Sequence, residues 1–239
     1  MPQSFTSRVL PHALQRRLRR RTVSIRRIRD SPGSWTRAEL RFRAPRIPHR
    51  EVFARIEEQA RVTEEQGALP LWHGYADVRG YPKTTGRGAT RTSNQVRTQR
   101  QVGEFYTWLV LNRRPSSILE FGTAFGVSGM YWLAGLEANG AGHVFTFEPN
   151  EVWSEIARHN LSQIGRRFTL TTGTLEDNFE IVPDELDLVF IDAIHTGEFV
   201  RSQLELVLPK TAPGALVVFD DIDFSSDMRS CWDDISPVS

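Results

Sequence analysis

Short apolar runs alternate with amphipathic segments over the second half of the chain. Five runs are rich in apolar and β-branched residues; they cover 117–121, 143–147, 168–172, 186–191 and 215–219. The segments between them space their apolar residues as helices do; they cover 127–138, 150–164, 174–181 and 196–208. Near-continuous apolar strands separated by helices are typical of a parallel sheet that is covered on both faces. The pattern therefore predicts an α/β fold with a doubly wound, mostly parallel sheet.

The first half of the chain shows a different pattern. Residues 8–29 place leucine and isoleucine on one helical stripe among arginines, and the three prolines of residues 31–50 favour a linker. Helical spacing returns at 50–66 and at 94–112, where Ser93 is the expected N-cap. We expect three parts: an arginine-rich extension and linker over 1–49, a helical cap with a basic loop over 50–114, and the main domain over 115–239.

The net charge of +1 hides a strong asymmetry. Residues 1–50 carry a net charge of +12, residues 51–114 carry +3, and residues 115–239 carry −14. A basic head of this kind can dock on the acidic body of its own chain, on nucleic acid or on an anionic surface. Docking on the chain's own body, or a partly disordered arm, is the preferred interpretation of residues 8–29. A membrane-surface helix and an organelle transit segment stay open for the same residues.

The composition is that of an ordinary globular chain, with 39% hydrophobic and 25% charged residues. No apolar run approaches the roughly 18 residues that a membrane span needs. Cys231 is the single cysteine, so no intrachain disulfide can form. Residues 1–30 lack the apolar core of a signal peptide. We therefore expect a cytoplasmic protein without a transmembrane segment.

A glycine-rich turn follows the first predicted strand. It begins Glu120-Phe-Gly122-Thr123 and continues to Gly126 and Ser128, with the spacing GxxxGxxG rather than the GxGxxG of dinucleotide folds. Glycines allow a tight turn and a close approach to a ligand, and the next helix offers free N–H groups to an anion. The turn therefore predicts a binding site, and its spacing disfavours a pyrophosphate.

Polar residues also follow the second and third predicted strands. Glu148 can accept hydrogen bonds from both hydroxyls of a ribose, or it can simply start the helix after Pro149. Gly173-Thr174-Leu175 can form the wall of an adenine site, and Thr174 can also cap a helix. Ligands of such sheets bind beyond the carboxyl ends of the strands, so we expect these residues to share one site.

Acids follow the fourth and fifth predicted strands. Asp192, Asp220 and Asp221 would supply oxygen ligands for Mg²⁺ or Ca²⁺ if the strands are neighbours, and otherwise each would be a cap or a solvent-exposed acid. His195 follows Asp192 closely, and an unperturbed pKa of ~6.5 suits proton transfer near neutral pH. A structural role for His195 is the alternative.

Together these residues resemble the class I S-adenosylmethionine-dependent methyltransferases, from Ile118 to Asp221. ILEFGTAFGVS is similar to the family's first motif, and FTFEPN to its ribose-binding acidic motif. LDLVFIDAIHTGEFV and GALVVFDDI resemble the fourth-strand and fifth-strand motifs of the small-molecule O-methyltransferase branch. DDIDFSSDMRSCWDDI is most similar to bacterial members with a DDIxxSxxMxxxW signature. The resemblance implies a Rossmann-like fold.

The resemblance also implies an activity: in-line transfer of a methyl group from S-adenosylmethionine to a hydroxyl of a small-molecule acceptor. His195 and Asp192 would be catalytic. The cofactor would contact Glu120, Gly122, Thr123, Gly126, Ser128, Glu148, Gly173, Thr174, Leu175 and Asp192. Asp192, Asp220 and Asp221 match the cation ligands of metal-dependent relatives, but His195 stands where those often carry a lysine, and Ile194 is apolar where many carry a polar residue.

Relatives usually end their sheet with an antiparallel hairpin, but only twenty residues follow Phe219 here. We expect a sheet without that hairpin, truncated or divergent, whose apolar edge at 215–219 favours a homodimer. Three other functions stay open: a nicotinamide-dependent oxidoreductase, a nucleic-acid methyltransferase using the arginine-rich head, and a non-catalytic interaction protein. The missing GxGxxG disfavours the first, and the lack of aromatic residues among the basic ones disfavours the second.

Overall fold

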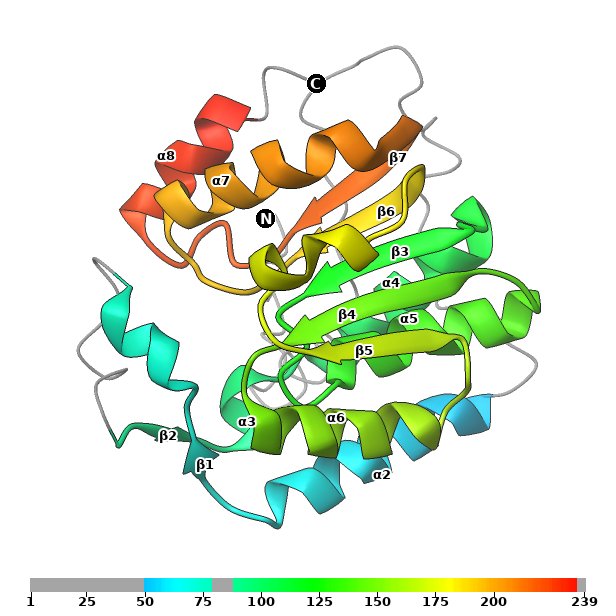
Figure 1. Cartoon of the computed structure of the whole chain (residues 1–239). Helices are drawn as coiled ribbons and strands as arrows, with labels where there is room; N and C mark the ends of the chain where they lie inside the picture. Colours follow the sequence, from blue (N-terminus) through cyan, green and yellow to red (C-terminus); the bar gives the residue numbers. More distant parts are fainter. Residues whose placement is uncertain (1–49, 79–87, 236–239) are drawn as a thin grey trace, which may run out of the picture.

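The computed structural model describes residues 50–78 and 88–235 (Figure 1). The expected helix at 8–29, the linker and residues 79–87 of the basic loop lie outside these residues. The described elements are, in chain order, α2 (Arg50–Glu64), β1 (Leu69–Pro70), η1 (His73–Asp77), β2 (Thr90–Arg91), α3 (Ser93–Val96), α4 (Arg100–Arg113), β3 (Ser117–Phe121), α5 (Val127–Asn139), β4 (His143–Glu148), α6 (Glu151–Ser162), β5 (Phe168–Thr172), η3 (Glu176–Ile181), β6 (Leu186–Ile191), α7 (Gly197–Val207), η4 (Leu208–Lys210), β7 (Thr211–Phe219) and α8 (Ser226–Ile235).

The predicted parallel sheet is confirmed. Its five strands lie in the order β5-β4-β3-β6-β7, and every neighbouring pair is parallel. The central strand β3 is buried along its whole length, as its run SILEF predicts. The order of the strands changes side at β3: β4 and β5 are added on one side of it, and β6 and β7 on the other. In such a sheet the ligand crevice opens at this switch point, beyond the carboxyl ends of the strands.

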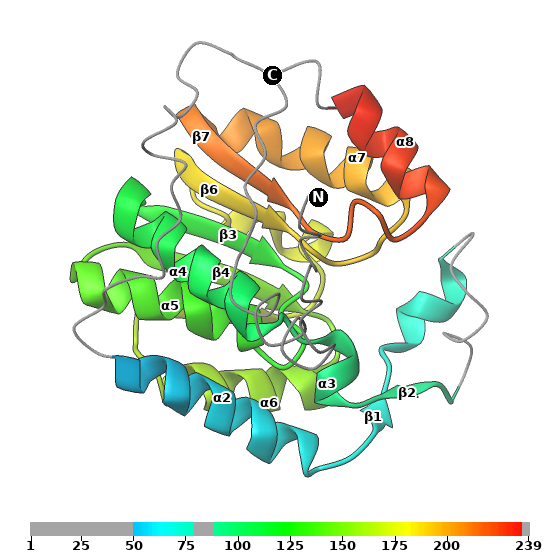
Figure 2. The same ribbon diagram turned by 180° about the vertical axis from the view of Figure 1, so that it is seen from behind.

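Helices cover both faces of the sheet, as predicted (Figures 1 and 2). Alternate strand residues point to opposite faces. On one face Ile118 and Phe190 join a core with α2, α4 and α5. On the other face Leu119 and Ile191 join a core with α7 and α8. The helices of the 50–114 segment thus bury their apolar residues in the same core as helices and strands of the main domain.

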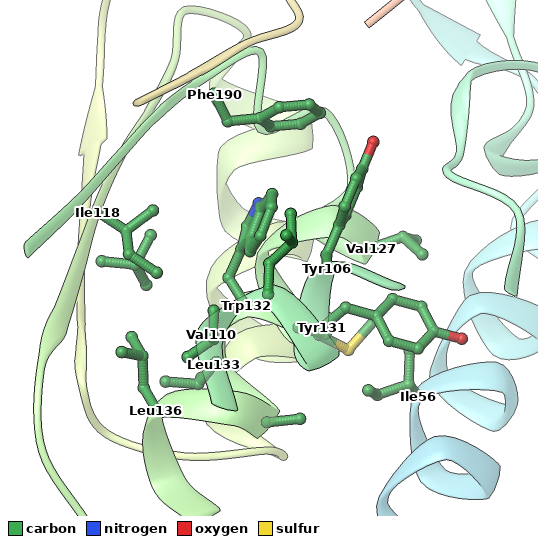
Figure 3. Packing of buried hydrophobic residues seen from close by; sticks show 14 of the residues in the cluster. Ile56, Tyr106, Val110, Ile118, Val127, Tyr131, Trp132, Leu133, Leu136 and Phe190 are labelled. Carbon is green, nitrogen blue, oxygen red and sulfur yellow. The ribbon is translucent and has the colours of Figure 1, made fainter. Parts of the chain in front are cut away.

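Aromatic rings fill the first of these cores at the end nearest the strand tips. Tyr106 stacks on Trp132, with ring centroids 4.3 Å apart and planes 13° from parallel. Both rings lie against Phe190, at centroid distances of 5.1 and 5.4 Å. Figure 3 shows the three rings gathered together, with Tyr131 beside Ile56 of α2. Each buried ring of this size contributes roughly 1.5–3 kcal/mol to folding, so this end of the core is firmly packed.

Three predicted elements differ from the structure. The predicted helix at 94–112 is divided into α3 and α4, because the backbone at Arg97 is extended (φ −84°, ψ 145°). Thr92 rather than Ser93 is the N-cap of α3, and its N–H donates to Gln95 Oε1 at 2.9 Å. Residues 176–181 form a 3₁₀-helix instead of an α-helix, and β7 begins at Thr211 rather than at residue 215. Contacts distant in sequence decide the first of these: Arg97 is drawn into an ion pair with Glu57 of α2.

Strand β7 forms one edge of the sheet, and within the described residues 220–235 the chain continues into α8 rather than a further strand. Helix α8 buries Met228 and Cys231 beside α7. Side chains of residues 215–219 are half-buried, so the apolar edge is not fully open. Homodimer formation through this edge stays a prediction. No helix within residues 50–78 and 88–235 combines the length and apolar character that crossing a membrane requires.

Candidate active site

A cavity of about 470 Å³ opens at the carboxyl ends of the strands. We call one side of it the floor, formed by residues at or just after the ends of β3, β4, β6 and β7: Gly122, Ala124, Glu148, Asp192, Ala193, His195, Asp220 and Asp221. We call the other side the wall, formed by the cap segment: Leu71, Tyr75, Arg91, Gln95, Val96, Arg97, Thr98, Gln99 and Val102. The cavity thus contains six of the thirteen site residues that the sequence predicts: Gly122, Glu148, Asp192, His195, Asp220 and Asp221.

The glycine turn is held in a conformation that few other residues adopt. Gly122 has φ +97°, Ala124 has φ +47° and Gly126 has φ +81°. A β-carbon at Gly122 would lie 1.8 Å from the carbonyl oxygen of Asp192. Only glycine fits there, because the ends of β3 and β6 approach too closely for a side chain. The close approach also leaves the backbone of the turn open to the cavity.

Glu148 lies at the end of β4 with 5% of its surface exposed. Its Oε2 accepts the N–H of Ala124 at 2.8 Å, and its Oε1 accepts the N–H of Asn150 at 2.9 Å. Burial raises the pKa of Glu148 to about 7, and these two backbone hydrogen bonds oppose the rise. Each carboxylate oxygen keeps a second lone pair, so the side chain can still accept a pair of ligand hydroxyls.

A second, more apolar cavity of about 290 Å³ adjoins the first at Gly122 and Glu148. Trp72, Leu175 and Phe199 contribute its apolar lining, and Gly173 and Thr174 border it as well. Thr174 also accepts the N–H of Asp177 at 3.2 Å, so its capping role and its place in the cavity coexist. The predicted adenine wall is therefore beside the predicted ribose acid, and the apolar lining of this cavity suits an aromatic ring.

Four predicted cofactor residues border neither cavity: Glu120, Thr123, Gly126 and Ser128. Glu120 lies near the end of the buried strand β3. It is fully buried beneath the turn, and its Oε2 accepts the hydroxyl of Thr146 at 2.8 Å. Burial raises its pKa to about 7, against the opposing effect of hydrogen bonds such as that from Thr146. Thr123 is also buried and donates to the carbonyl of Phe147 at 2.8 Å. Both residues support the turn from below.

His195 lies between two acids on the floor. Its Nε2 is 3.8 Å from Asp192 Oδ1 and 3.6 Å from Asp221 Oδ2. Burial lowers the pKa of His195, while the charges of Asp221 and Asp220 oppose that shift. Burial, together with the charges of Asp220 and Asp221, raises the pKa of Asp192 well above its usual value. A neutral imidazole beside carboxylates can accept a proton and have the resulting cation stabilised.

Asp220 is committed to the protein itself. Its Oδ2 accepts the hydroxyl of Tyr106 at 3.1 Å, and its Oδ1 accepts the N–H of Asp221 at 2.8 Å. Among the described residues, no three acidic, histidine or cysteine side chains are arranged so that they could hold a metal ion. Asp192, Asp220 and Asp221 as placed here therefore do not fit the predicted cation site.

Several lining residues have no counterpart in the sequence predictions. The wall residues Tyr75, Arg91 and Arg97 come from the cap segment, in which the sequence pattern predicts no site residue. Phe224 borders the cavity with its ring 5.1 Å from that of His195. Tyr106 is a buried core residue of α4, yet its hydroxyl also donates to Asp220. Helical spacing reveals that a residue is buried, but not what its polar end contacts.

Comparisons with known proteins agree with this geometry. Residues 119–222 match the model of a family described as a methyltransferase domain. An uncharacterized protein, y4gI of Sinorhizobium fredii, is 27% identical over 146 residues, which are 54% of this chain and 16% of that protein. The chain therefore spans about a sixth of the length of this curated relative.

Solved structures share the fold. An O-methyltransferase from Bacillus cereus in complex with S-adenosylhomocysteine (SAH) is 21% identical, with a TM-score of 0.55, over 77% of this chain and 79% of that one. The O-methyltransferase TomG from Streptomyces achromogenes, in complex with S-adenosylmethionine, is 18% identical, with a TM-score of 0.55, over 77% and 78% of the two chains. At these identities the similarity to the two structures establishes the Rossmann-like fold and nothing further.

Proposed function

We propose, on the premise that residues 119–222 form a methyltransferase domain, that the protein transfers a methyl group from S-adenosylmethionine to a hydroxyl of a small molecule. One observation carries the proposal. The glycine turn at Gly122, the buried acid Glu148 and the histidine His195 border a single cavity. Their combination supplies a ribose acceptor, a close backbone surface and a base within one space.

The residues present fit this donor. Glu148 borders both cavities, so a group that can accept hydrogen bonds from two ribose hydroxyls lies between the main cavity and the second one. We call the second cavity, with its lining of Trp72, Leu175 and Phe199, the apolar lobe. The lobe would take the adenine ring, and Glu148 would accept the ribose hydroxyls. The turn at Gly122 would face the amino-acid tail. When bound, the donor supplies a methyl group on a positively charged sulfur, so the reaction needs no further activation of the donor.

His195 would act on the acceptor. Its neutral imidazole would take the proton of the acceptor hydroxyl, and Asp192 and Asp221 would stabilise the imidazolium that forms. The wall would hold the acceptor against His195 and exclude water, which aligns the two reactants. No step is assigned to a metal ion, because the acidic side chains of the floor do not fit one.

The proposal is tested by turnover with methyl-labelled S-adenosylmethionine and a panel of hydroxylated small molecules. We expect His195→Gln to lower turnover by about 100-fold or more without changing SAH affinity. His159→Gln is the matched control, because His159 is exposed on α6 and borders neither cavity. Excess EDTA should leave turnover unchanged. Full activity of His195→Gln would remove His195 as the base, and loss of activity in EDTA would favour a metal.

A further inference from the structure

A narrow hollow opens beside the main cavity at the glycine turn. Its sheet side consists of residues 122–125, Val127, Ser128 and Asp192, and its cap side consists of Val96, Arg97 and Thr98. The two charged residues among these are Arg97 and Asp192. The hollow therefore has a cation from the cap and an acid from the sheet. Arg97 also borders the main cavity, so this residue lies where the two spaces meet.

Arg97 is held firmly in this place. Its Nη2 lies 2.5 Å from Glu57 Oε1, and its Nε donates to the carbonyl of Thr98 at 3.3 Å. The hydroxyl of Tyr131 donates to the same oxygen of Glu57 at 2.8 Å, which fixes the carboxylate in turn. Only 13% of the Arg97 side chain is exposed. A guanidinium carries five N–H donors, so these two bonds leave others for a ligand.

We propose that Arg97 is a cofactor-binding residue that recognises the α-carboxylate of the donor's amino-acid tail. The inference rests on the proposed function, because it requires the adenosine to lie at Glu148 and the tail to lie at the glycine turn. An amino acid carries a carboxylate and an ammonium on one carbon. The hollow itself is only about 10 Å³ in volume, but Arg97 and Asp192 border the main cavity as well, and there Arg97 would be the partner of the carboxylate and Asp192 the partner of the ammonium. Guanidinium and carboxylate also match in shape and form paired hydrogen bonds.

The break in the predicted helix at 94–112 places Arg97 in the wall of the cavity. The extended backbone at Arg97 ends α3 and starts the short connection to α4 within the wall. A continuous helix would give Arg97 helical backbone angles instead of the extended ones it has here. The alternative is that Arg97 only ties this connection to α2 through Glu57. The two roles differ in one respect: only the first depends on the carboxylate of the ligand.

Calorimetry with two ligands separates these roles. SAH has the amino-acid tail, whereas 5′-methylthioadenosine keeps the adenosine and the thioether but lacks the tail. We expect Arg97→Gln to weaken SAH by about 10- to 100-fold and to change methylthioadenosine by less than about 2-fold. Arg100→Gln is the matched control, because it removes the same charge three residues away. Arg100 pairs with Glu104 at 2.8 Å and borders neither the two cavities nor the hollow. It should leave the affinities for both ligands unchanged.

A second measurement uses the unaltered protein, in case Arg97→Gln does not fold. SAH should bind at least about 10-fold more tightly than its analogue that lacks only the carboxylate. Equal SAH affinity in Arg97→Gln and the unaltered protein would overturn the inference and leave the proposed function intact. Equal weakening of both ligands would show a structural role and would also overturn it. Failure of the unaltered protein to bind SAH at all would overturn the proposed function itself.

Discussion

The floor and the wall of the cavity are built in different ways. The floor stands on strands whose register is fixed: Phe121 pairs with both Phe147 and Ile191, so the tips of β3, β4 and β6 are level. The wall stands on short elements, since β1 and β2 have two residues each and α3 has four. Its ties to the rest include the 2.8 Å bond from Asn150 Nδ2 to the carbonyl of Pro70. The floor residues are therefore positioned by the strands of a regular sheet, whereas the wall is held in place by scattered contacts.

The largest expected effect is on the floor, at Gly122. Gly122→Ala should lower the free energy of unfolding by about 4 kcal/mol or more, because the added methyl group would collide with the carbonyl of Asp192 and force the strand tips apart. Gly140→Ala is the control, since Gly140 also has positive φ (+66°) but nothing lies within 4 Å of its β-carbon position. It should cost only about 1 kcal/mol. Equal costs in denaturant melts would mean that the close approach at Gly122 is not structural.

A smaller effect should come from the carboxyl group buried beneath the floor. The pKa of Glu120 is raised to about 7 by burial, so the folded protein holds a proton that the unfolded chain releases near pH 4.5. The stability that this supplies is complete below about pH 4.5 and is lost as the pH rises through 7, a change of about 3 kcal/mol. Glu120→Gln should remove that part of the fall in unfolding free energy between pH 4.5 and 8.

Glu148 provides the contrast for this pH experiment. Its pKa is raised to about 7 by the same cause, but it borders the cavity, so ribose hydroxyls that favour its charged form should lessen its share of the pH dependence. Glu148 is the acid that remains in Glu120→Gln, and Glu120 is the acid that remains in Glu148→Gln. SAH should therefore reduce the pH dependence of the unfolding free energy more in Glu120→Gln than in Glu148→Gln. Identical profiles for the unaltered protein and Glu120→Gln would contradict the burial of an acid beneath the turn.

The smallest effect should come from the wall. Gln95→Ala removes the side chain that accepts the N–H of Thr92 at 2.9 Å, and Gln95 is itself exposed. We expect a loss of less than about 1 kcal/mol in unfolding free energy, as for other helix-start contacts. Hydrogen exchange should quicken at residues 92–97 and stay unchanged in β3. A cost above about 2 kcal/mol, or faster exchange in β3, would show that the wall is as rigid as the floor.

The sequence predicts the two regions unequally. The five apolar runs predict all five strands of the sheet, and the residues after them include Gly122, Glu148 and His195, because buried parallel strands place their ends on one edge. The wall follows from no local pattern, since a broken helix at Arg97 depends on Glu57, far away in the sequence. Glu120 shows a second limit of the sequence prediction. It is part of the motif next to the turn, but its side chain is fully buried and does not reach the cavity, because it belongs to the buried strand β3.

The central claim is that the strand tips and the glycine turn form one adenosyl site. It is tested most directly by titrating SAH into the protein at pH 8, where Glu148 is charged, and comparing Glu148→Gln with Glu151→Gln, whose altered side chain is exposed on α6. The account predicts binding at one site, a loss of about 30- to 100-fold in Glu148→Gln, and no change in Glu151→Gln. Equal affinity of Glu148→Gln and the unaltered protein for SAH would contradict it.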